Sequence, residues 1–214
     1  MSQIHMSPMQ RLNLHCFVPP NSVISYIGKR VSNFIALRSD DKLLSHVKDC
    51  DENVLVVFLF GHGDEYGFYC SSETKSLTEP VRILPEWWDL SGLARNVQTY
   101  LFALVCNSYF HLAGSEMRNY LKGAIGFDDQ IMMSLDKSDV DFWIWFFKKL
   151  YVQLEARSKI DHKTYISIES LYKKHYSRNH TGLVALLRAL CGRRLSYLTR
   201  LCLVNQLEAM KLAI

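Results

Sequence analysis

The chain has 214 residues, of which 49% are hydrophobic and 21% are charged, a composition typical of a folded globular protein rather than a disordered one. No run approaches the ~18 apolar residues of a membrane-spanning helix, and the N-terminus lacks a basic start followed by an apolar core, so we expect no membrane span and no secretory signal. Six cysteines are scattered without CxxC spacing, which favours free thiols in a reducing cytoplasm. The length fits one large domain, or one domain with a small helical appendage.

The first part of the chain predicts a strand, two helices and a second strand. Residues 12–18 predict a strand that ends at two prolines, and Asn21 can cap a helix whose apolar residues recur at helical spacing up to Ile35. A second short helix is expected at 41–48. The run NVLVVFLF at 53–60 is almost entirely apolar, which is typical of a central parallel strand that helices cover on both faces.

The alternation of strands and helices continues after Gly61. The expected elements are a short strand at 68–70, a helix at 84–96, a buried strand at 100–105, a helix at 117–121, a strand at 123–127 and an almost wholly apolar helix at 139–154. This βαβα order predicts an α/β sandwich with a mostly parallel central sheet.

The tail of the chain is predicted to be helical from Thr164 onward, with leucine or valine recurring every three residues from Leu195. Of the 25 basic and 21 acidic residues of the chain, eight Lys or Arg and one Glu lie between Lys173 and the end. Such a basic tail can meet nucleic acid or an acidic partner, although solvated amphipathic helices are the commoner explanation. We expect residues 161–214 to form a basic helical extension that packs on a domain at 1–160 or docks a partner.

Two of the predicted buried strands end in reactive side chains. His62 follows the run at 53–60 and Cys106 follows the run at 100–105. Catalysis in open parallel sheets collects at the carboxyl ends of the strands, so these side chains are expected on neighbouring loops. A thiol is a good nucleophile and an imidazole can accept its proton. Taken singly, the cysteine is more simply a small buried hydrophobe and the histidine a loop residue; their order and spacing together favour a catalytic pair.

Gly63 completes the chemistry that this pair would need. A glycine after the histidine lets a substrate carbonyl approach the backbone, because it has no Cβ. Its N–H and that of Cys106 could form an oxyanion hole for acyl transfer. This chemistry needs no cofactor. His111 follows Cys106 by five residues, but no further ligands stand at metal-binding spacing, so we expect no metal site.

The two motifs resemble the signature of the caspase-like clan of cysteine peptidases, which includes caspases, separases and CHAT proteins. VLVVFLFGHGDEYGFY is similar to the histidine strand of that clan and YLFALVCNS to its cysteine strand, and LKGAIGFDD followed by DFWIWFFKKLY resembles the CHAT branch. The resemblance covers residues 12–157. It implies a caspase-like α/β/α sandwich in which His62 and Cys106 are the catalytic dyad.

The resemblance also implies a function. It suggests an endopeptidase that cleaves a specific protein substrate under the control of a regulatory partner protein. CHAT proteins often work beside sensor modules in bacterial antiviral defence or programmed cell death, and this setting is carried over by analogy. Separases place an acidic specificity residue after the third strand, so Asp128 and Asp129 are candidates for binding a basic P1 side chain. A helix cap or exposed turn explains these two residues equally well.

Two other functions remain open. The chain could be a catalytically silent caspase-like interaction domain that keeps the dyad but acts by docking within a larger complex. It could also be a nucleic-acid-associated factor built around the basic tail. Aromatic residues do not interleave with basic ones and no recognition-helix pattern is present, so we do not expect nucleic acid as a partner.

Overall fold

The computed structural model describes ten ranges of the chain. They are 23–31, 43–44, 54–64, 67–70, 81–83, 85–89, residue 92, 97–134, 136–176 and 197–213. The strand expected at 12–18 lies outside the described residues, as do most of the helix expected at 41–48 and the basic stretch at 177–196.

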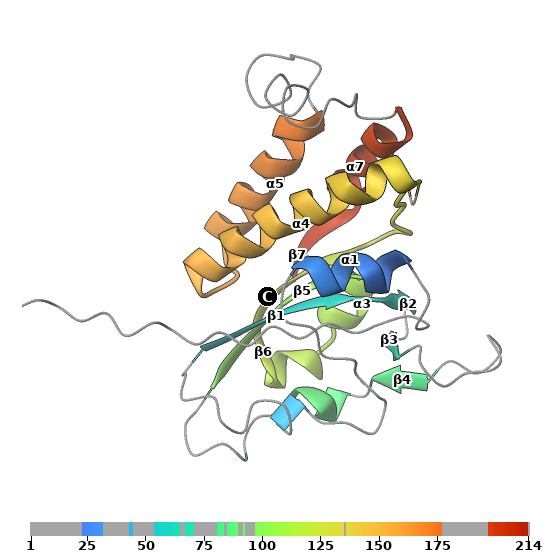
Figure 1. Ribbon diagram of the computed structural model, residues 1–214. Helices are drawn as coiled ribbons and strands as arrows, with labels where there is room; N and C mark the ends of the chain where they lie inside the picture. The colour runs from blue at the N-terminus through green and yellow to red at the C-terminus, as the bar shows by residue number, and fades with distance from the viewer. Residues whose placement is uncertain are drawn as a thin grey trace, which may run out of the picture.

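A four-stranded sheet forms the centre of the described structure (Figure 1). Its strands are β1 (Val54–Phe60), β5 (Gln98–Leu104), β6 (Leu121–Phe127) and β7 (Met210–Ala213), in the order β1-β5-β6-β7. β5 runs parallel to both β1 and β6, whereas β7 is antiparallel to β6. The prediction of a mixed α/β fold with a mostly parallel central sheet is therefore confirmed.

The central strands are apolar on both faces because side chains alternate between the two faces of a sheet. One buried cluster contains Leu55, Val57 and Leu59 together with Leu101, Ala103 and Val105. The other contains Val56, Phe58 and Phe60 together with Phe102 and Leu104. Each face therefore needs its own covering layer.

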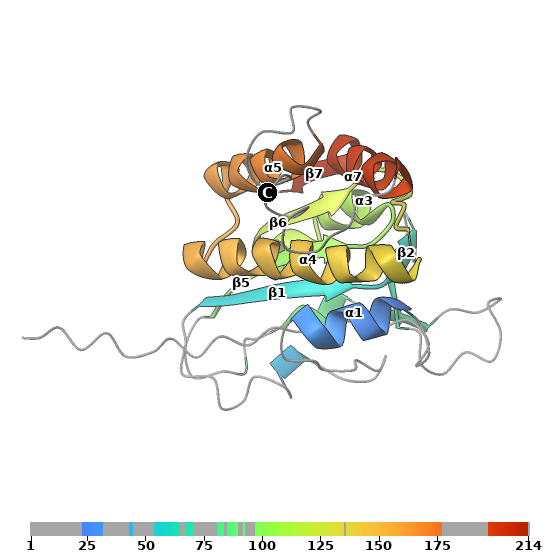
Figure 2. The same cartoon turned by 45° about the horizontal axis from the view of Figure 1, so that its top comes forward.

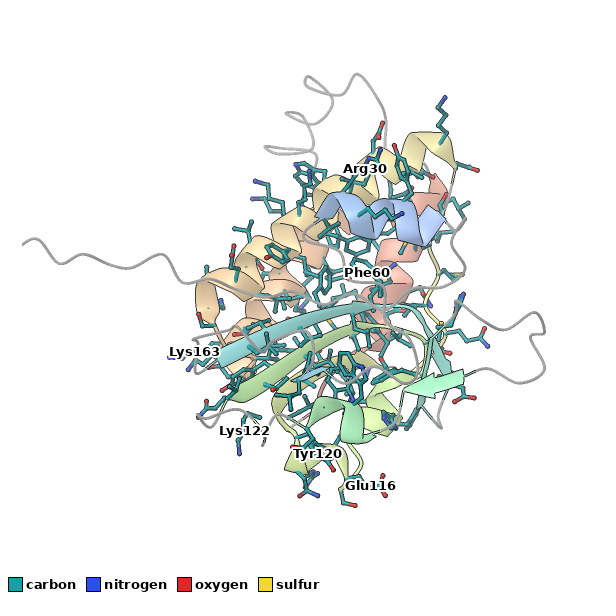
Figure 3. All side chains as sticks on the ribbon, turned by 60° about the horizontal axis from the view of Figure 1, so that its bottom comes forward. Arg30, Phe60, Glu116, Tyr120, Lys122 and Lys163 are labelled. Carbon is teal, nitrogen blue, oxygen red and sulfur yellow. The ribbon has the colours of Figure 1, made fainter. Side chains whose placement is uncertain are left out.

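Four helices pack on the Phe60 side of the sheet, as Figures 1 and 2 show. They are α1 (Val23–Val31), α4 (Lys137–Arg157), α5 (His162–Tyr176) and α7 (Tyr197–Ala209). The short helix α3 (Ser108–Leu112) and the 3-10 turns η1 (Pro85–Trp88) and η2 (Met117–Asn119) lie on the opposite side. In Figure 3 a labelled residue marks each side of the sheet: Phe60 marks the side of α1 and α4, and Tyr120 marks the opposite side.

A small antiparallel sheet begins directly after β1. Its strands are β2 (His62–Asp64), β3 (Gly67–Cys70) and β4 (Val81–Ile83), in the order β2-β3-β4. The chain bends at Gly61, so β2 leaves the central sheet and pairs with β3. The short strand expected at 68–70 is thus confirmed. His62 opens a strand instead of lying on a loop.

The helix predicted at 84–96 is wrong. The described part of this region is the 3-10 turn Pro85–Trp88, and Asp89 and Gly92 are not helical. Trp87 and Trp88 are almost fully buried beneath the sheet, with ring centroids 4.6 Å apart. Trp87 and Trp88 therefore fill the core from a 3-10 turn and not from the face of an α-helix.

The helix predicted at 117–121 is also largely wrong. Met117–Asn119 form a single 3-10 turn, and Leu121 already begins β6. The helix of this region is α3, which starts two residues after Cys106 and was not expected. The helix predicted at 139–154 is confirmed in α4, although Val152 on its outer face is 56% exposed.

The tail is helical in α5 and α7, but the prediction that it is entirely helical is wrong. Residues Met210–Ala213 form β7 and pair with Ala124–Phe127 of β6. The extension at 161–214 therefore supplies a strand to the central sheet as well as helices. The three-residue leucine spacing does not mark the buried face of α7: Leu203 is fully buried, whereas Leu198 and Leu201 are exposed. At 3.6 residues per turn, a three-residue spacing drifts around the helix.

None of the helices in the described ranges combines the length and the apolar character that crossing a bilayer would require.

Candidate active site

The carboxyl ends of β1, β5 and β6 lie at one edge of the sheet because these strands are parallel. Phe60 pairs with Leu104 at the ends of β1 and β5, and the Gly61 N–H extends the ladder by donating to the Leu104 carbonyl oxygen (3.4 Å). His62 and Cys106 therefore occupy matching positions, each two residues beyond that last pair. Neighbouring strands are about 4.8 Å apart, so the strand ends that lead to His62 and to Cys106 are adjacent on this edge.

Gly63 packs directly against the turn that carries Cys106. A Cβ at Gly63 would lie 2.5 Å from Val105 Cγ1, 2.8 Å from the Gly67 carbonyl oxygen and 3.3 Å from the Cys106 carbonyl oxygen. No side chain fits in this space, so the position after His62 requires glycine. The segments of the expected histidine and cysteine motifs are thus in contact.

Cys106 lies at a sharp turn from strand to helix. Asn107 has φ +53°, in the left-handed region that asparagine tolerates better than most residues, and α3 begins at Ser108. The Cys106 side chain is half-buried. Its thiol points to the Ile131 carbonyl oxygen with Sγ and O 3.9 Å apart, a weak contact for a thiol donor. This turn presents the thiol at the edge of the sheet.

Ser108 holds the turn in place, and the sequence analysis assigned it no role. Its buried hydroxyl donates to the Ala103 carbonyl oxygen (3.3 Å) and accepts from the Phe127 N–H (3.0 Å). It therefore ties the end of β5 to the end of β6. Gly126 lets α3 approach, since a Cβ there would lie 2.9 Å from Ser108 Oγ. The sequence alone does not reveal this role of Ser108, because its two hydrogen-bond partners come from two separate strands.

The backbone donors around Cys106 are partly engaged. The Asn107 N–H donates to Asp129 O (3.1 Å) and the Ser108 N–H to Val105 O (3.4 Å). In the described part of the chain, no backbone carbonyl accepts from the Cys106 N–H. A donor of this kind can bind a developing oxyanion.

His62 is exposed at the edge of the sheet, at the start of β2. The protein around it removes part of the water, and this desolvation lowers the pKa of His62 below its usual value. The imidazole is therefore neutral at neutral pH. A neutral imidazole can accept a proton from a thiol.

Asp128 and Asp129 follow β6 at the same edge, but their environments differ. The Asp128 carboxylate forms an ion pair with Lys211 of β7 (3.1 Å), so its charge is already balanced. Asp129 is exposed, and its carboxylate accepts a hydrogen bond from the neighbouring Gln130 N–H (2.6 Å). Its backbone carbonyl oxygen accepts from the Asn107 N–H. Asp129 is therefore the acidic residue that adjoins the Cys106 turn.

His111 does not extend the site. Its ring packs edge-on against Phe68 of β3, with the ring centroids 4.9 Å apart. Within the described ranges, no group of three or more His, Cys, Asp or Glu residues is arranged to hold a metal ion. The edge of the sheet thus brings together His62, Gly63 and Cys106, with Asp129 beside them.

No protein-family model matches the chain, and no curated protein matches it at a significant level. The functional assignment therefore rests on the fold and on the residues at this edge of the sheet.

Proposed function

We propose that the protein is a cysteine endopeptidase of the caspase-like type, in which His62 and Cys106 form the catalytic dyad. The observation that carries this proposal is the matching position of the two residues beyond the Phe60–Leu104 pair of neighbouring parallel strands. The contact of Gly63 with the Cys106 turn supports it as well. A mostly parallel sheet with helical layers on both faces is compatible with a caspase-like sandwich.

The proposed reaction is peptide-bond hydrolysis in two steps. His62 accepts the Cys106 thiol proton, and the thiolate attacks the scissile carbonyl carbon. The Cys106 and Gly63 N–H groups stabilise the oxyanion of the tetrahedral intermediate. His62 then protonates the departing amine as the C–N bond breaks, which leaves an acyl-enzyme. Water attacks the thioester carbonyl carbon while His62 takes up a proton from it. The C–S bond then breaks and His62 returns that proton to the Cys106 sulfur, which releases the carboxylic acid and restores the free thiol.

Substrate choice is assigned to the acidic residues after β6. Asp129 would attract a Lys or Arg side chain at P1, because its carboxylate is exposed beside the Cys106 turn. Asp128 would contribute less, since Lys211 balances its charge. A partner protein would regulate the enzyme. Bacterial antiviral defence or programmed cell death is the setting that the resemblance to CHAT proteins favours.

A second candidate is a catalytically silent interaction domain. One observation favours it: in the described part of the chain, the hydrogen-bond acceptor near Cys106 Sγ is the Ile131 carbonyl and not the His62 ring. A dyad held in this way is either inactive or in a resting arrangement. The structure of the edge thus motivates a direct test of thiol chemistry.

Labelling with a peptidyl acyloxymethyl ketone that carries Lys or Arg at P1 separates the two candidates. A cysteine peptidase is labelled at Cys106, and both Cys106→Ala and His62→Ala lose the label. Cys202→Ala is the matched control, because Cys202 is a buried free cysteine of α7 and its removal should leave labelling unchanged. An equal, slow labelling of several cysteines would support the interaction domain instead.

A further inference from the structure

The segment that follows β6 connects the Cys106 turn with helix α7. On the side of the turn, the Asp129 carbonyl accepts from the Asn107 N–H (3.1 Å) and the Ile131 carbonyl faces the Cys106 thiol (3.9 Å). These are alternate residues of the segment. Its position therefore defines one wall around the thiol.

The intervening backbone groups of the segment bind two amide side chains of α7. The Gln130 carbonyl accepts from Asn205 Nδ2 (3.1 Å), and the Met132 N–H donates to Asn205 Oδ1 (2.7 Å). The Met132 carbonyl accepts from Gln206 Nε2 (2.8 Å). An extended chain turns successive groups to opposite sides, so the segment contacts the turn with one set of groups and α7 with the other.

A residue of α5 forms a hydrogen bond with the Gln206 side chain. Gln206 is fully buried, and its Oε1 accepts from the hydroxyl of Tyr172 (3.1 Å), which is also fully buried. Burial raises the pKa of Tyr172 far above its usual value, so the hydroxyl keeps its proton and remains a donor. The amide oxygen is therefore committed to Tyr172 and the amide nitrogen to Met132.

The start of the segment is fixed to the same end of α7. The Asp128 N–H donates to the Ala209 carbonyl oxygen (2.8 Å), and its carboxylate pairs with Lys211. A shift of α7 that keeps these hydrogen bonds therefore moves Asp128, Gln130 and Met132 together.

We propose that Asn205 and Gln206 are positioning residues for Cys106: through the segment Asp129–Met132, helix α7 sets the position of the thiol and so regulates its reactivity. The consequence for proteolysis rests on the proposed function. The effect on the thiol does not, because alkylation by a small reagent requires only access to a reactive sulfur.

The test is the rate at which iodoacetamide alkylates Cys106, followed by mass spectrometry of the peptide that contains it. Asn205→Ala removes two of the three side-chain contacts at a half-exposed position, and Gln206→Leu removes the third. Glu208→Gln is the control on the same helix, since Glu208 is exposed and contributes its backbone carbonyl to Lys211. Cys202 of α7 is buried and serves as an internal probe of unfolding.

We expect both variants to alkylate Cys106 about five-fold faster than the wild type, the effect of losing one or two hydrogen bonds that keep Ile131 over the thiol. Cys202 stays protected and Glu208→Gln behaves as the wild type. If Cys202 becomes reactive in Gln206→Leu, that variant has partly unfolded, and the proposal is then judged on Asn205→Ala. Unchanged Cys106 alkylation in Asn205→Ala with Cys202 protected would overturn the proposal. So would exposure of Cys202 in that variant, because Asn205 would then hold the helix rather than the segment.

Peptide hydrolysis by the same samples separates this proposal from the proposed function. Positioning predicts that kcat falls in Asn205→Ala while KM changes little. If the wild type itself hydrolyses no peptide, the proposed function fails, yet faster alkylation in the variants still supports the link between α7 and Cys106.

Discussion

Gly63 lies so close to Cys106 that a Cβ on Gly63 would be 3.3 Å from the Cys106 carbonyl oxygen. Gly63 directly follows His62, so the contact couples the placement of the imidazole to that of the thiol. The chain bends at Gly61 to make this possible, because β2 has to leave the central sheet and pair with β3. The proposed site therefore depends on a close approach of two backbone segments as much as on its two reactive side chains.

Gly63→Ala should destabilise the protein and impair activity. The added methyl would meet Val105 Cγ1 at 2.5 Å and the Gly67 carbonyl oxygen at 2.8 Å, and the second of these is backbone that cannot turn away. We expect a loss of about 1–3 kcal/mol in the free energy of unfolding, measured by urea denaturation. Gly114→Ala is the milder comparison and should cost less, since the nearest atom to its Cβ, the His111 carbonyl oxygen, lies at 3.1 Å, whereas two atoms lie below 3.0 Å at Gly63. Equal stability of Gly63→Ala and the wild type would refute the close contact.

Ser108→Ala should lower stability without preventing folding. The substitution deprives the buried Phe127 N–H of its acceptor and the Ala103 carbonyl oxygen of its donor. Leaving a buried backbone group unsatisfied costs about 1–3 kcal/mol, which denaturation curves can resolve. Exposed Ser115 provides the comparison, and Ser115→Ala should change nothing measurable. If the two serine variants are equally stable, Ser108 does not tie β5 to β6.

His175 should make stability depend on pH. Its ring is buried against Trp145 (5.0 Å between centroids) and Phe146 (5.8 Å), and burial lowers the pKa of His175 to about 4. The unfolded chain, with the usual pKa of 6.5, binds a proton more readily. The contribution of His175 is thus fully present above pH 6.5, falls as the pH drops toward 4, and levels off below it.

The measurement is the free energy of unfolding between pH 7 and pH 4 for the wild type and His175→Phe. The variant should lose less stability than the wild type over this interval, because it has no proton to bind. His162→Gln replaces an exposed histidine at the start of the same helix and is the control for the loss of a histidine as such. Parallel curves for the wild type and His175→Phe would contradict the prediction.

Asp129→Asn should weaken a preference for Lys or Arg at P1 more than Asp128→Asn does. The Asp129 carboxylate is exposed beside the Cys106 turn, whereas the Asp128 charge is paired with Lys211. An exposed ion pair contributes up to about 1 kcal/mol, so we expect roughly a five-fold change in kcat/KM for basic substrates. A peptide library profile provides the measurement. A wild-type profile that favours Asp or small apolar residues at P1 rules out this assignment.

The strands that carry the site could be predicted because each is a short apolar run with polar residues at its end. VLVVFLF and QTYLFAL form β1 and β5, and the fold places His62 and Cys106 beyond them. Parallel pairing then puts both ends at one edge. This inference needs no knowledge of packing, since it follows from strand direction alone.

Other parts of the site and fold could not be predicted because they depend on distant contacts. β7 is a four-residue strand, MKLA, that directly follows a helix and gains its structure by pairing with β6. Asn205 accepts a hydrogen bond from the Met132 N–H, and these residues are 73 positions apart in the sequence. An amide side chain in a helix gives no local sign of such a partner. Trp87 and Trp88 contributed to the wrong prediction of a helix at 84–96, because both side chains are buried although they lie in a 3-10 turn.

The central claim is tested most directly by the rate of peptide hydrolysis in the wild type, Cys106→Ala and His62→Ala. Both side chains lie at the edge of the sheet and not in its core, so each variant should keep the wild-type unfolding transition. Cys106→Ala should be inactive, and His62→Ala should be slower by at least about a hundred-fold, the usual contribution of a general base. Cleavage at the wild-type rate by either folded variant would contradict the assignment of His62 and Cys106 as the catalytic dyad.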